Sequence, residues 1–332
     1  MGCKRVRVLV TGISGQLGYD VVEVGERIRA KMEVEAKERG VEPSGRVSEI
    51  VGLDRAACNV SSMSSVMRAV YEVQPDVIVH AGAYTKVDLA EAEGRLEAYA
   101  VNAYGTRAMA QAAAEVGARL VYVSTDYVFD GTKGSAYTEW DEPAPLNEYG
   151  RSKLAGEQFV RAFVRNHYIV RTSWVYGAHT GLQGGNFVKA MLQLAQTQMQ
   201  ERADGRAELS VVADQVGSPT WSRDLADGIW RLLLADADSV EPTSTYGRYG
   251  TYHMSGKGSC SWYEFAQAIF AECGLSDCVT IRPITTDEFP RKARRPALSL
   301  LEPLALEAQG MLGLRDWREA LHDFMEEYDR PQ

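Results

Sequence analysis

Short runs of apolar, mostly β-branched residues alternate with longer stretches of helical periodicity through the first half of the chain. The apolar runs predict strands at 6–10, 49–53, 77–80, 119–124 and 168–172. The stretches between them predict helices at 62–72, 97–116 and 146–164. The strand segments are apolar without alternation, as is typical of strands that are buried on both faces. This order of elements predicts an α/β fold with a doubly wound parallel sheet and helices on both of its faces.

The second half of the chain is less regular. After residue 172, Gly-rich and aromatic segments separate predicted helices at 187–200, 222–234, 262–273 and 316–327. We therefore expect one domain over residues 1–172 and a smaller C-terminal lobe over residues 173–332, with segments around 210–255 returning to the first domain. Residues 23–48 form a long charged stretch, which predicts an extended surface helix and loop with a solvated charged face.

Composition narrows the class of protein. The 332 residues contain 36 Lys and Arg against 45 Asp and Glu, a formal net charge of −9 that disfavours a general nucleic-acid or anionic-membrane surface. Any anionic ligand must then be held by a local site. The five cysteines are scattered without a C-x-x-C pair, so neither a disulfide framework nor a metal site is predicted. With no signal-peptide pattern and no long apolar stretch, the sequence predicts a cytoplasmic protein without membrane contact.

A glycine-rich turn follows the first predicted strand. Gly12, Gly15 and Gly18 recur every three residues where the strand passes into a helix. Glycine permits a tight turn and lets backbone N–H groups approach a pyrophosphate at the positive end of the helix dipole. The spacing is G-x-x-G-x-x-G and differs from the common dinucleotide fingerprint, so a glycine-rich turn without a ligand stays an alternative.

Two residues at the end of the second strand bear on cofactor choice. Asp54 can accept hydrogen bonds from an adenosine ribose, whereas its neighbour Arg55 can pair with a 2′-phosphate. They favour NADH and NADPH respectively, so the sequence leaves that choice open.

Three further residues suit acid–base chemistry at a carbonyl group. Four-residue spacing puts Tyr149 and Lys153 on one face of a helix. A nearby ammonium lowers the pKa of a phenol from about 10, so we expect the pKa of Tyr149 to be lowered toward the working range of a general acid. Thr125 ends the fourth strand, where its hydroxyl can donate to a carbonyl oxygen that gains charge. Each feature alone also arises by chance on surface helices and strand-exit turns.

Taken together, these motifs resemble the extended short-chain dehydrogenase/reductases, and within them the dTDP-4-dehydrorhamnose reductase family. The resemblance spans nearly the whole chain. Its matching segments are 11–18, 83–88, 124–131, 145–147, 149–150, 153–157, 171–177, 214–215, 217–220 and 295–297. The strings Thr-Asp-Tyr-Val-Phe-Asp-Gly (125–131) and Gln-x-Gly-Ser-Pro-Thr (215–220) are its most specific parts. The resemblance implies a Rossmann-like dinucleotide-binding domain and a smaller C-terminal substrate-binding lobe.

The resemblance also assigns residues. It implies a catalytic set of Thr125, Tyr149 and Lys153, with Tyr149 as proton donor and Asn102 supporting the lysine. It implies cofactor contacts at Gly12, Gly15, Gln16, Leu17, Gly18, Asp54, Asn59, Val60, Ala81, Gly82, Ala83, Tyr149 and Lys153. It implies substrate contacts at Thr125, Asp126, Trp174 and Gln215.

The implied reaction is NAD(P)H-dependent reduction of the 4-keto group of dTDP-4-dehydro-6-deoxy-L-mannose to dTDP-L-rhamnose. NADPH is the expected cofactor, with NADH as the alternative, and a homodimer is the expected assembly. Mg²⁺ can assist dimers in this family, but no ligand constellation in the sequence supports it. Two other functions stay open: a nucleotide-sugar epimerase or dehydratase that keeps its NAD, and a non-catalytic NADP-binding regulatory subunit of the methionine adenosyltransferase type.

The chain departs from the family pattern in three places. Asn59-Val60 stands where an acidic residue usually precedes an apolar one, and Gly82 interrupts an alanine run. The long stretch 23–48 makes the alignment of Asp54 less certain. A basic cluster at 291–295 is expected to lie near an anionic diphosphate or to be exposed to solvent.

Overall fold

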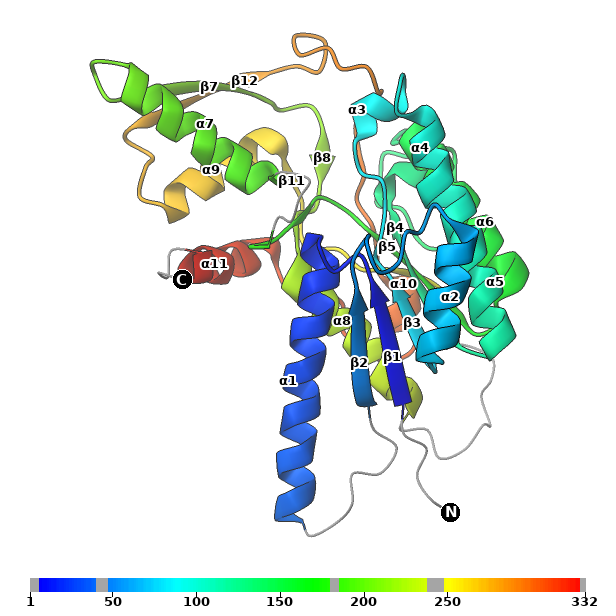
Figure 1. Cartoon of the computed structure of the whole chain (residues 1–332). Helices are drawn as coiled ribbons and strands as arrows, with labels where there is room; N and C mark the ends of the chain where they lie inside the picture. The colour runs from blue at the N-terminus through cyan, green and yellow to red at the C-terminus, as the bar shows by residue number, and fades with distance from the viewer. Residues whose placement is uncertain (1–5, 40–46, 180–184, 238–247, 329–332) are drawn as a thin grey trace.

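Six parallel strands form the central sheet, in the order β10-β5-β4-β3-β1-β2 (Figure 1). The computed structural model describes residues 6–39, 47–179, 185–237 and 248–328. The strands are β1 (Val6–Thr11), β2 (Val47–Leu53), β3 (Val77–His80), β4 (Arg119–Thr125), β5 (His167–Thr172) and β10 (Gly250–His253). From β1 the chain first adds β2 on one side and then returns to add β3 on the other. Ligands of such sheets bind at this reversal, beyond the carboxyl ends of β1 and β3.

The predicted doubly wound parallel sheet is confirmed. In β1, Val8 and Val10 face one hydrophobic core while Leu9 faces the other, since successive strand residues point to opposite sides. The first core lies under α1 (Gln16–Glu38) and α8 (Ser222–Ala237). The second lies under α2 (Met63–Val73), α5 (Thr106–Val116) and α6 (Glu148–Phe163). Burial on both faces explains why the strands read as unbroken apolar runs.

The helix predicted at 97–116 is wrong as a single element. The chain forms α4 (Arg95–Tyr99), a π-helix η1 (Ala100–Gly105) and only then α5. Gly105 sits where a Cβ would lie 2.5 Å from the Val60 carbonyl oxygen. The π-helix therefore lies where two backbone segments approach each other closely, and the hydrophobic periodicity of the sequence gives no sign of such an approach.

The C-terminal residues build a second group of elements beyond the carboxyl ends of the strands (Figure 1). Its helices are α7 (Phe187–Glu201), α9 (Trp262–Glu272) and α11 (Trp317–Tyr328). Its strand pairs are β7 (Ala207–Val212) with β12 (Val279–Ile284), β6 (Val175–Tyr176) with β9 (Thr220–Trp221), and β8 (Val216–Gly217) with β11 (Cys260–Ser261). Strand β10 and helix α8 leave this group and pack with the central sheet and α1.

The charged stretch from residue 23 continues α1 past the amino ends of β1 and β2 (Figure 1). Along it, Arg29 pairs with Glu26 and with Glu33, both at 2.7 Å. Residues 40–46 of the expected loop lie outside the described residues, and β2 begins at Val47. None of the helices in the described ranges has the length and apolar character needed to cross a bilayer.

Candidate active site

The glycine turn after β1 forms a narrow backbone cradle. Gly12 has φ +78°, and a Cβ there would lie 2.7 Å from the Cα of Gly82. A Cβ at Gly18 would lie 2.3 Å from the Gly12 carbonyl oxygen. Gly15 is the N-cap of α1. Only glycine fits at Gly12 and Gly18, so the amino end of a 23-residue helix stays open to an anionic group such as a pyrophosphate.

Gly82, one of the departures from the family pattern, has room for a Cβ atom. A Cβ at Gly82 would come no closer than 3.5 Å to Thr11 Oγ1, which is ordinary contact, and 3.6 Å from a Val60 methyl. Its neighbour Ala81 packs against the first core, and Ala83 follows before Tyr84. An alanine at Gly82 is therefore compatible with the cradle, so this departure leaves the predicted cofactor side intact.

The residues after β2 lie as follows. The carboxylate of Asp54 accepts a hydrogen bond from the Ala57 N–H at 2.9 Å. The guanidinium of Arg55, with 69% of its side chain exposed, lies 3.6 Å from Glu97. Asn59 Oδ1 accepts from the hydroxyl of Ser61 at 2.8 Å. Asp54 is thus held in a local turn, and Arg55 is largely exposed beside Glu97.

Gln16 and Leu17 are the first two residues of helix α1, and their side chains make different contacts. Leu17 is buried in the first core. The Gln16 side chain reaches the C-terminal elements: its Oε1 accepts from Asn186 Nδ2 at 2.6 Å, and its Nε2 donates to the Val175 carbonyl at 3.4 Å. The glycine cradle is thereby tied to the start of α7, which Asn186 caps.

Helix α6 approaches the end of β4 closely because of its glycines. A Cβ at Gly150 would lie 2.1 Å from the Tyr127 carbonyl oxygen, and one at Gly156 would lie 2.5 Å from that of Asn102. Asn147 caps the helix by accepting from the Gly150 N–H at 2.8 Å. The face of α6 that carries the predicted tyrosine and lysine is thus pressed against β4 and its exit turn.

Lys153 is buried beneath the site. Its ammonium donates to the Val123 carbonyl at 2.6 Å and lies 4.2 Å from the centre of the Tyr122 ring. Burial lowers the pKa of Lys153 to about 7, while the charge of Glu157 acts in the opposite direction. Glu157 follows Lys153 by four residues, so Tyr149, Lys153 and Glu157 share one helix face.

The expected lowering of the Tyr149 pKa is wrong for this structure. Burial of the phenol raises the pKa well above its usual value, and the carboxyl of Asp126 adds to the rise. The Thr125 hydroxyl beside the phenol acts in the opposite direction. The ammonium of Lys153 is directed to the Val123 carbonyl, so burial decides the pKa of Tyr149.

Thr125 and Asp126 form the exit turn of β4 beside Tyr149. The Thr125 hydroxyl lies 3.0 Å from Asp126 Oδ1 and accepts from the Tyr127 N–H at 3.2 Å. Asp126 is only 3% exposed, and burial raises its pKa to about 7, although the nearby hydroxyls of Ser299 and Thr125 lower it. The structure therefore brings Thr125, Asp126, Tyr149 and Lys153 together.

Asn102 lies in the π-helix and is 1% exposed. Its side chain accepts from the Tyr84 N–H at 2.8 Å and donates to the Tyr84 carbonyl and the Ser152 hydroxyl, both at 3.0 Å. These side-chain contacts reach the residue before Lys153 rather than the ammonium. The side chain thus fixes the segment after β3 against α6, next to Lys153.

The two substrate residues expected in the C-terminal lobe are held by that lobe. Trp174 has φ +47°, stacks on Trp262 with ring centres 3.5 Å apart, and leaves room only for glycine at Gly217. Gln215 Nε2 donates to the Thr286 hydroxyl at 3.0 Å. Trp174 is partly buried and offers an aromatic surface, whereas the amide donor of Gln215 is used inside the lobe.

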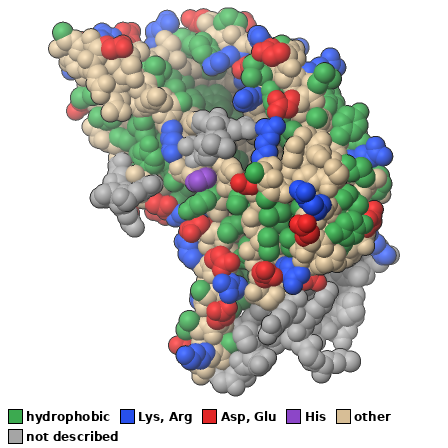
Figure 2. Space-filling model, in the orientation of Figure 1, with side chains coloured by type: hydrophobic (Ala, Val, Ile, Leu, Met, Phe, Trp, Pro, Cys, Tyr) green, Lys and Arg blue, Asp and Glu red, His purple; other side chains and the backbone are tan. Residues whose placement is uncertain are grey.

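The basic cluster at 291–295 binds the sheet side of the molecule. Arg295 makes two bonds to Asp88, at 3.0 and 2.8 Å, and Arg291 lies 3.9 Å from the same carboxylate. Arg295 is therefore committed to an ion pair and is not a free anion-binding group. The face in Figure 2 is nevertheless hollowed between the two lobes, and Lys and Arg side chains border that hollow. A local basic rim of this kind can attract a diphosphate in spite of the net charge.

Comparison with known proteins agrees with this geometry. Residues 6–330 match the family described as RmlD substrate binding domain. The chain belongs to this family. It is 38% identical over 321 residues to the spore coat polysaccharide biosynthesis protein SpsK of Bacillus subtilis, with 97% of each chain covered. It is 37% identical over 322 residues to the dTDP-4-dehydrorhamnose reductase of Burkholderia thailandensis, covering 95% of this chain and 97% of that protein.

A solved structure gives the same picture. The dTDP-4-dehydrorhamnose reductase of Bacillus anthracis, in complex with NADP, has a TM-score of 0.79 and 40% identity to this chain. The match covers 98% of this chain and 100% of that one. The fold of this family member and the layout of its two lobes are therefore those of a reductase whose structure holds NADP.

Sequence reasoning missed a buried ion pair of this RmlD-family chain. The Glu157 carboxylate accepts four hydrogen bonds: from Arg171 Nε at 2.9 Å and Nη2 at 2.8 Å, from the Ser124 hydroxyl at 2.6 Å, and from Arg161 at 3.0 Å. These donors, Arg171 above all, hold the pKa of Glu157 below its usual value despite its burial. The sequence signals are the four-residue steps from Lys153 to Glu157 and from Glu157 to Arg161 on α6, whereas Ser124 and Arg171 come from β4 and β5.

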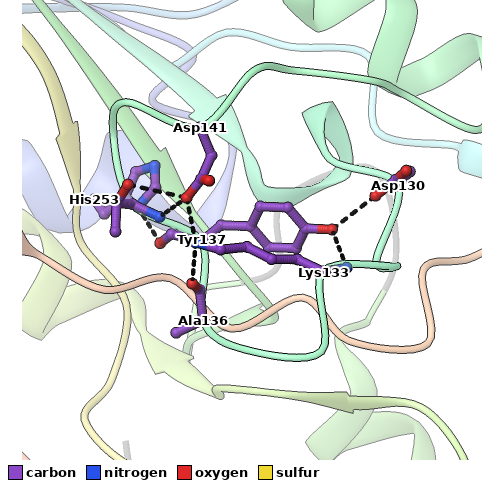
Figure 3. A network of polar contacts seen from close by, with 7 residues as sticks. Asp130, Lys133, Ala136, Tyr137, Asp141 and His253 are labelled. Carbon is purple, nitrogen blue, oxygen red and sulfur yellow. Dashed lines mark hydrogen bonds and ion pairs between the residues drawn. The ribbon is translucent and has the colours of Figure 1, made fainter.

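A second missed network holds the exit turn of β4 (Figure 3). The Tyr137 hydroxyl donates to Asp130 at 2.7 Å, and its carbonyl lies 3.0 Å from Nδ1 of His253 on β10. Lys133 pairs with Asp141 at 2.6 Å. These contacts fix the segment that follows Thr125 to the edge of the sheet. Among the described residues, no group of His, Cys, Asp and Glu is arranged to hold a metal ion.

Proposed function

We propose that this protein reduces the 4-keto group of dTDP-4-dehydro-6-deoxy-L-mannose to dTDP-L-rhamnose with NADPH. The proposal is carried by full-length similarity to dTDP-4-dehydrorhamnose reductases together with a Tyr149–Lys153 pair beside Thr125. In this proposal residues 1–172 hold the cofactor and residues 173–332 hold the sugar nucleotide, while β10 and α8 return to the sheet.

The glycine cradle fits the cofactor, because Gly12 and Gly18 leave the amino end of α1 open to its pyrophosphate. NADPH bound there supplies the hydride. We propose NADPH over NADH because a similar reductase is in complex with NADP, and we propose that the largely exposed guanidinium of Arg55 meets its 2′-phosphate. Comparing kcat/KM for NADPH and NADH in the wild type and in Arg55→Ala tests this. An unchanged ratio in the variant would contradict the role of Arg55.

Tyr149 is the proposed proton donor. Burial raises the pKa of its phenol, so the phenol keeps its proton at neutral pH and can give it to the alkoxide that develops at C4. Lys153 would hold the nicotinamide ribose. Thr125 would donate a hydrogen bond to the reacting carbonyl oxygen. Trp174 would offer its ring to the apolar face of the deoxysugar.

The decisive experiment follows NADPH absorbance while dTDP-4-keto-6-deoxymannose is supplied. We expect Tyr149→Phe to retain NADPH binding and to lose about 10²–10⁴-fold in kcat, because the proton donor is gone. Tyr71→Phe is the matched control, since Tyr71 is 47% exposed on α2 and has no assigned role, and it should keep wild-type kcat. A Tyr149→Phe enzyme with near-wild-type kcat would refute the assignment.

Two other functions have their own tests. An epimerase or dehydratase would copurify with stoichiometric NAD and would consume no external reductant. A non-catalytic regulatory subunit would recover a methionine adenosyltransferase in a pull-down and would not reduce the keto sugar. Either result would replace the reductase proposal.

We also propose a homodimer in the cytoplasm. Leu96, 85% exposed, and Tyr104 lie close together in the chain on α4 and η1, and such exposed apolar side chains favour a protein contact. The buried free thiols of Cys58 and Cys260 are consistent with a reducing compartment. Sedimentation velocity at micromolar concentration tests the dimer, and a monomer there would contradict it.

A further inference from the structure

The Thr125 hydroxyl has one hydrogen and two groups that require it. In the structure it lies 3.0 Å from Asp126 Oδ1, and it already accepts the Tyr127 N–H at 3.2 Å. The proposed reaction needs the same hydrogen for the substrate carbonyl. A charged Asp126 can only accept, so it would take that hydrogen away from the substrate.

The surroundings of Asp126 suit a neutral acid. Its Oδ2 is buried and has no hydrogen-bond partner in the described structure. A buried carboxylate is stable only when donors or cations surround it. The groups that face Asp126 are the phenols of Tyr127 and Tyr149, the hydroxyls of Thr125 and Ser299, and two backbone N–H groups of its own turn, and none of these is a cation.

The cation nearest in this region does not stabilise the charged form of Asp126. Arg295, which acts on the Tyr127 phenol, is committed to Asp88 by two bonds at 3.0 and 2.8 Å. Burial accordingly raises the pKa of Asp126 to about 7 against the effect of the neighbouring hydroxyls. The carboxyl therefore changes its charge near neutral pH.

We propose that Asp126 is a positioning residue that acts as a neutral carboxylic acid. It donates its own hydrogen to Thr125 Oγ1, which leaves the Thr125 hydrogen for the substrate carbonyl. No proton leaves Asp126 in this arrangement. The inference rests on the proposed function only for the identity of the carbonyl compound.

Ionisation of Asp126 would reverse the hydrogen bond and turn Thr125 away from the substrate. In the wild type we expect kcat to be constant below about pH 6.5 and to fall about a hundredfold per pH unit above neutrality, because Asp126 and Lys153, whose pKa burial lowers to about 7, both lose a proton there. Asp126→Asn keeps a neutral donor at every pH, because its amide N–H₂ can face Thr125. We expect this variant to keep only the fall of about tenfold per pH unit that belongs to Lys153.

The result can contradict the proposal in two ways. If Asp126→Asn shows the same alkaline fall as the wild type, another group titrates. If it is inactive at every pH while it still binds NADPH and unfolds cooperatively, the reaction needs the carboxylate. Ser299→Ala provides a directional check: since Ser299 favours the carboxylate, its loss should move the fall of kcat to higher pH.

A second measurement separates this inference from the reductase proposal. Difference infrared spectroscopy of the protein alone should show a protonated carboxyl that titrates near pH 7 and is absent in Asp126→Asn. The band is independent of turnover, so it decides the state of Asp126 even if the keto sugar is not reduced. Protonation only below about pH 5, as for an ordinary Asp, would overturn the inference.

Discussion

Two acids buried to a similar degree flank the proposed site, and they behave in opposite ways. Glu157 on α6 is 0% exposed, and Asp126 after β4 is 3% exposed. Glu157 receives four bonds from Ser124, Arg161 and Arg171, and its pKa is lowered. Asp126 has an oxygen without a partner, and its pKa is raised to about 7.

The difference shows that burial alone does not set the charge of an acid. Desolvation disfavours both carboxylates and hydrogen bonds partly offset it at both, but only Glu157 also has cations beside it, Arg171 and Arg161. The Glu157 region is a structural brace in which a permanent charge holds β4, β5 and α6 together. The Asp126 region lies beside Thr125 and Tyr149, where a proton can be kept or released.

The largest expected effect on stability comes from removing the charge of Glu157. We expect Glu157→Gln to destabilise the fold by about 3–5 kcal/mol in urea unfolding at pH 7, because Arg171 would keep a buried charge without its partner. The folded pKa of Glu157 lies below the unfolded value, so its contribution is present at neutral pH and is lost as the pH falls below about 4.5. The double variant Glu157→Gln/Arg171→Met is the control and should recover part of the loss. If Glu157→Gln were as stable as the wild type, Glu157 would not carry a charge in the folded protein.

Replacing the Asp126 carboxyl with an amide should change the free energy of unfolding in the opposite direction. The folded pKa of Asp126 lies above the unfolded value, so its ionisation opposes folding increasingly as the pH rises from about 4 to 7. We expect Asp126→Asn to be more stable than the wild type at pH 8, by about 2–4 kcal/mol, with the gain vanishing near pH 4. Urea unfolding of both proteins at the two pH values measures it. A destabilised Asp126→Asn at pH 8 would mean that the folded protein stabilises the carboxylate of Asp126.

A smaller test removes one donor from each acid. Ser124→Ala should cost about 1–2 kcal/mol, because its hydroxyl donates to the charged Glu157 at 2.6 Å. Ser299→Ala is the matched control at Asp126, and it should cost less than about 1 kcal/mol because its partner is neutral. Equal costs in thermal unfolding at pH 6 would remove the distinction between the two acids.

The sequence anticipated the parts of the site that depend on local spacing. The glycines after β1, the four-residue step from Tyr149 to Lys153, and Thr125 at a strand end all lie on the elements that were predicted for them. Their positions follow from helical and strand periodicity, which is a property of neighbouring residues. Their chemical roles are predictions that the experiments above address.

The errors concern distant contacts. The split of the predicted helix at Asn102 accompanies the approach of Gly105 to Val60, which lies 45 residues earlier in the chain. The raised pKa of Tyr149 results from its burial against the β4 exit turn. The partner of Glu157 is Arg171 on a different strand. None of these contacts has a periodic signal.

By itself, the sequence determined the parallel sheet, the glycine cradle and the family, because apolar periodicity and local motifs record which residues must be buried together or turned sharply. Only the tertiary structure decided which buried groups carry charge. That property depends on which cations and hydrogen-bond donors the fold gathers around each group, and some of them, such as Arg171 and Ser299, come from other segments of the chain.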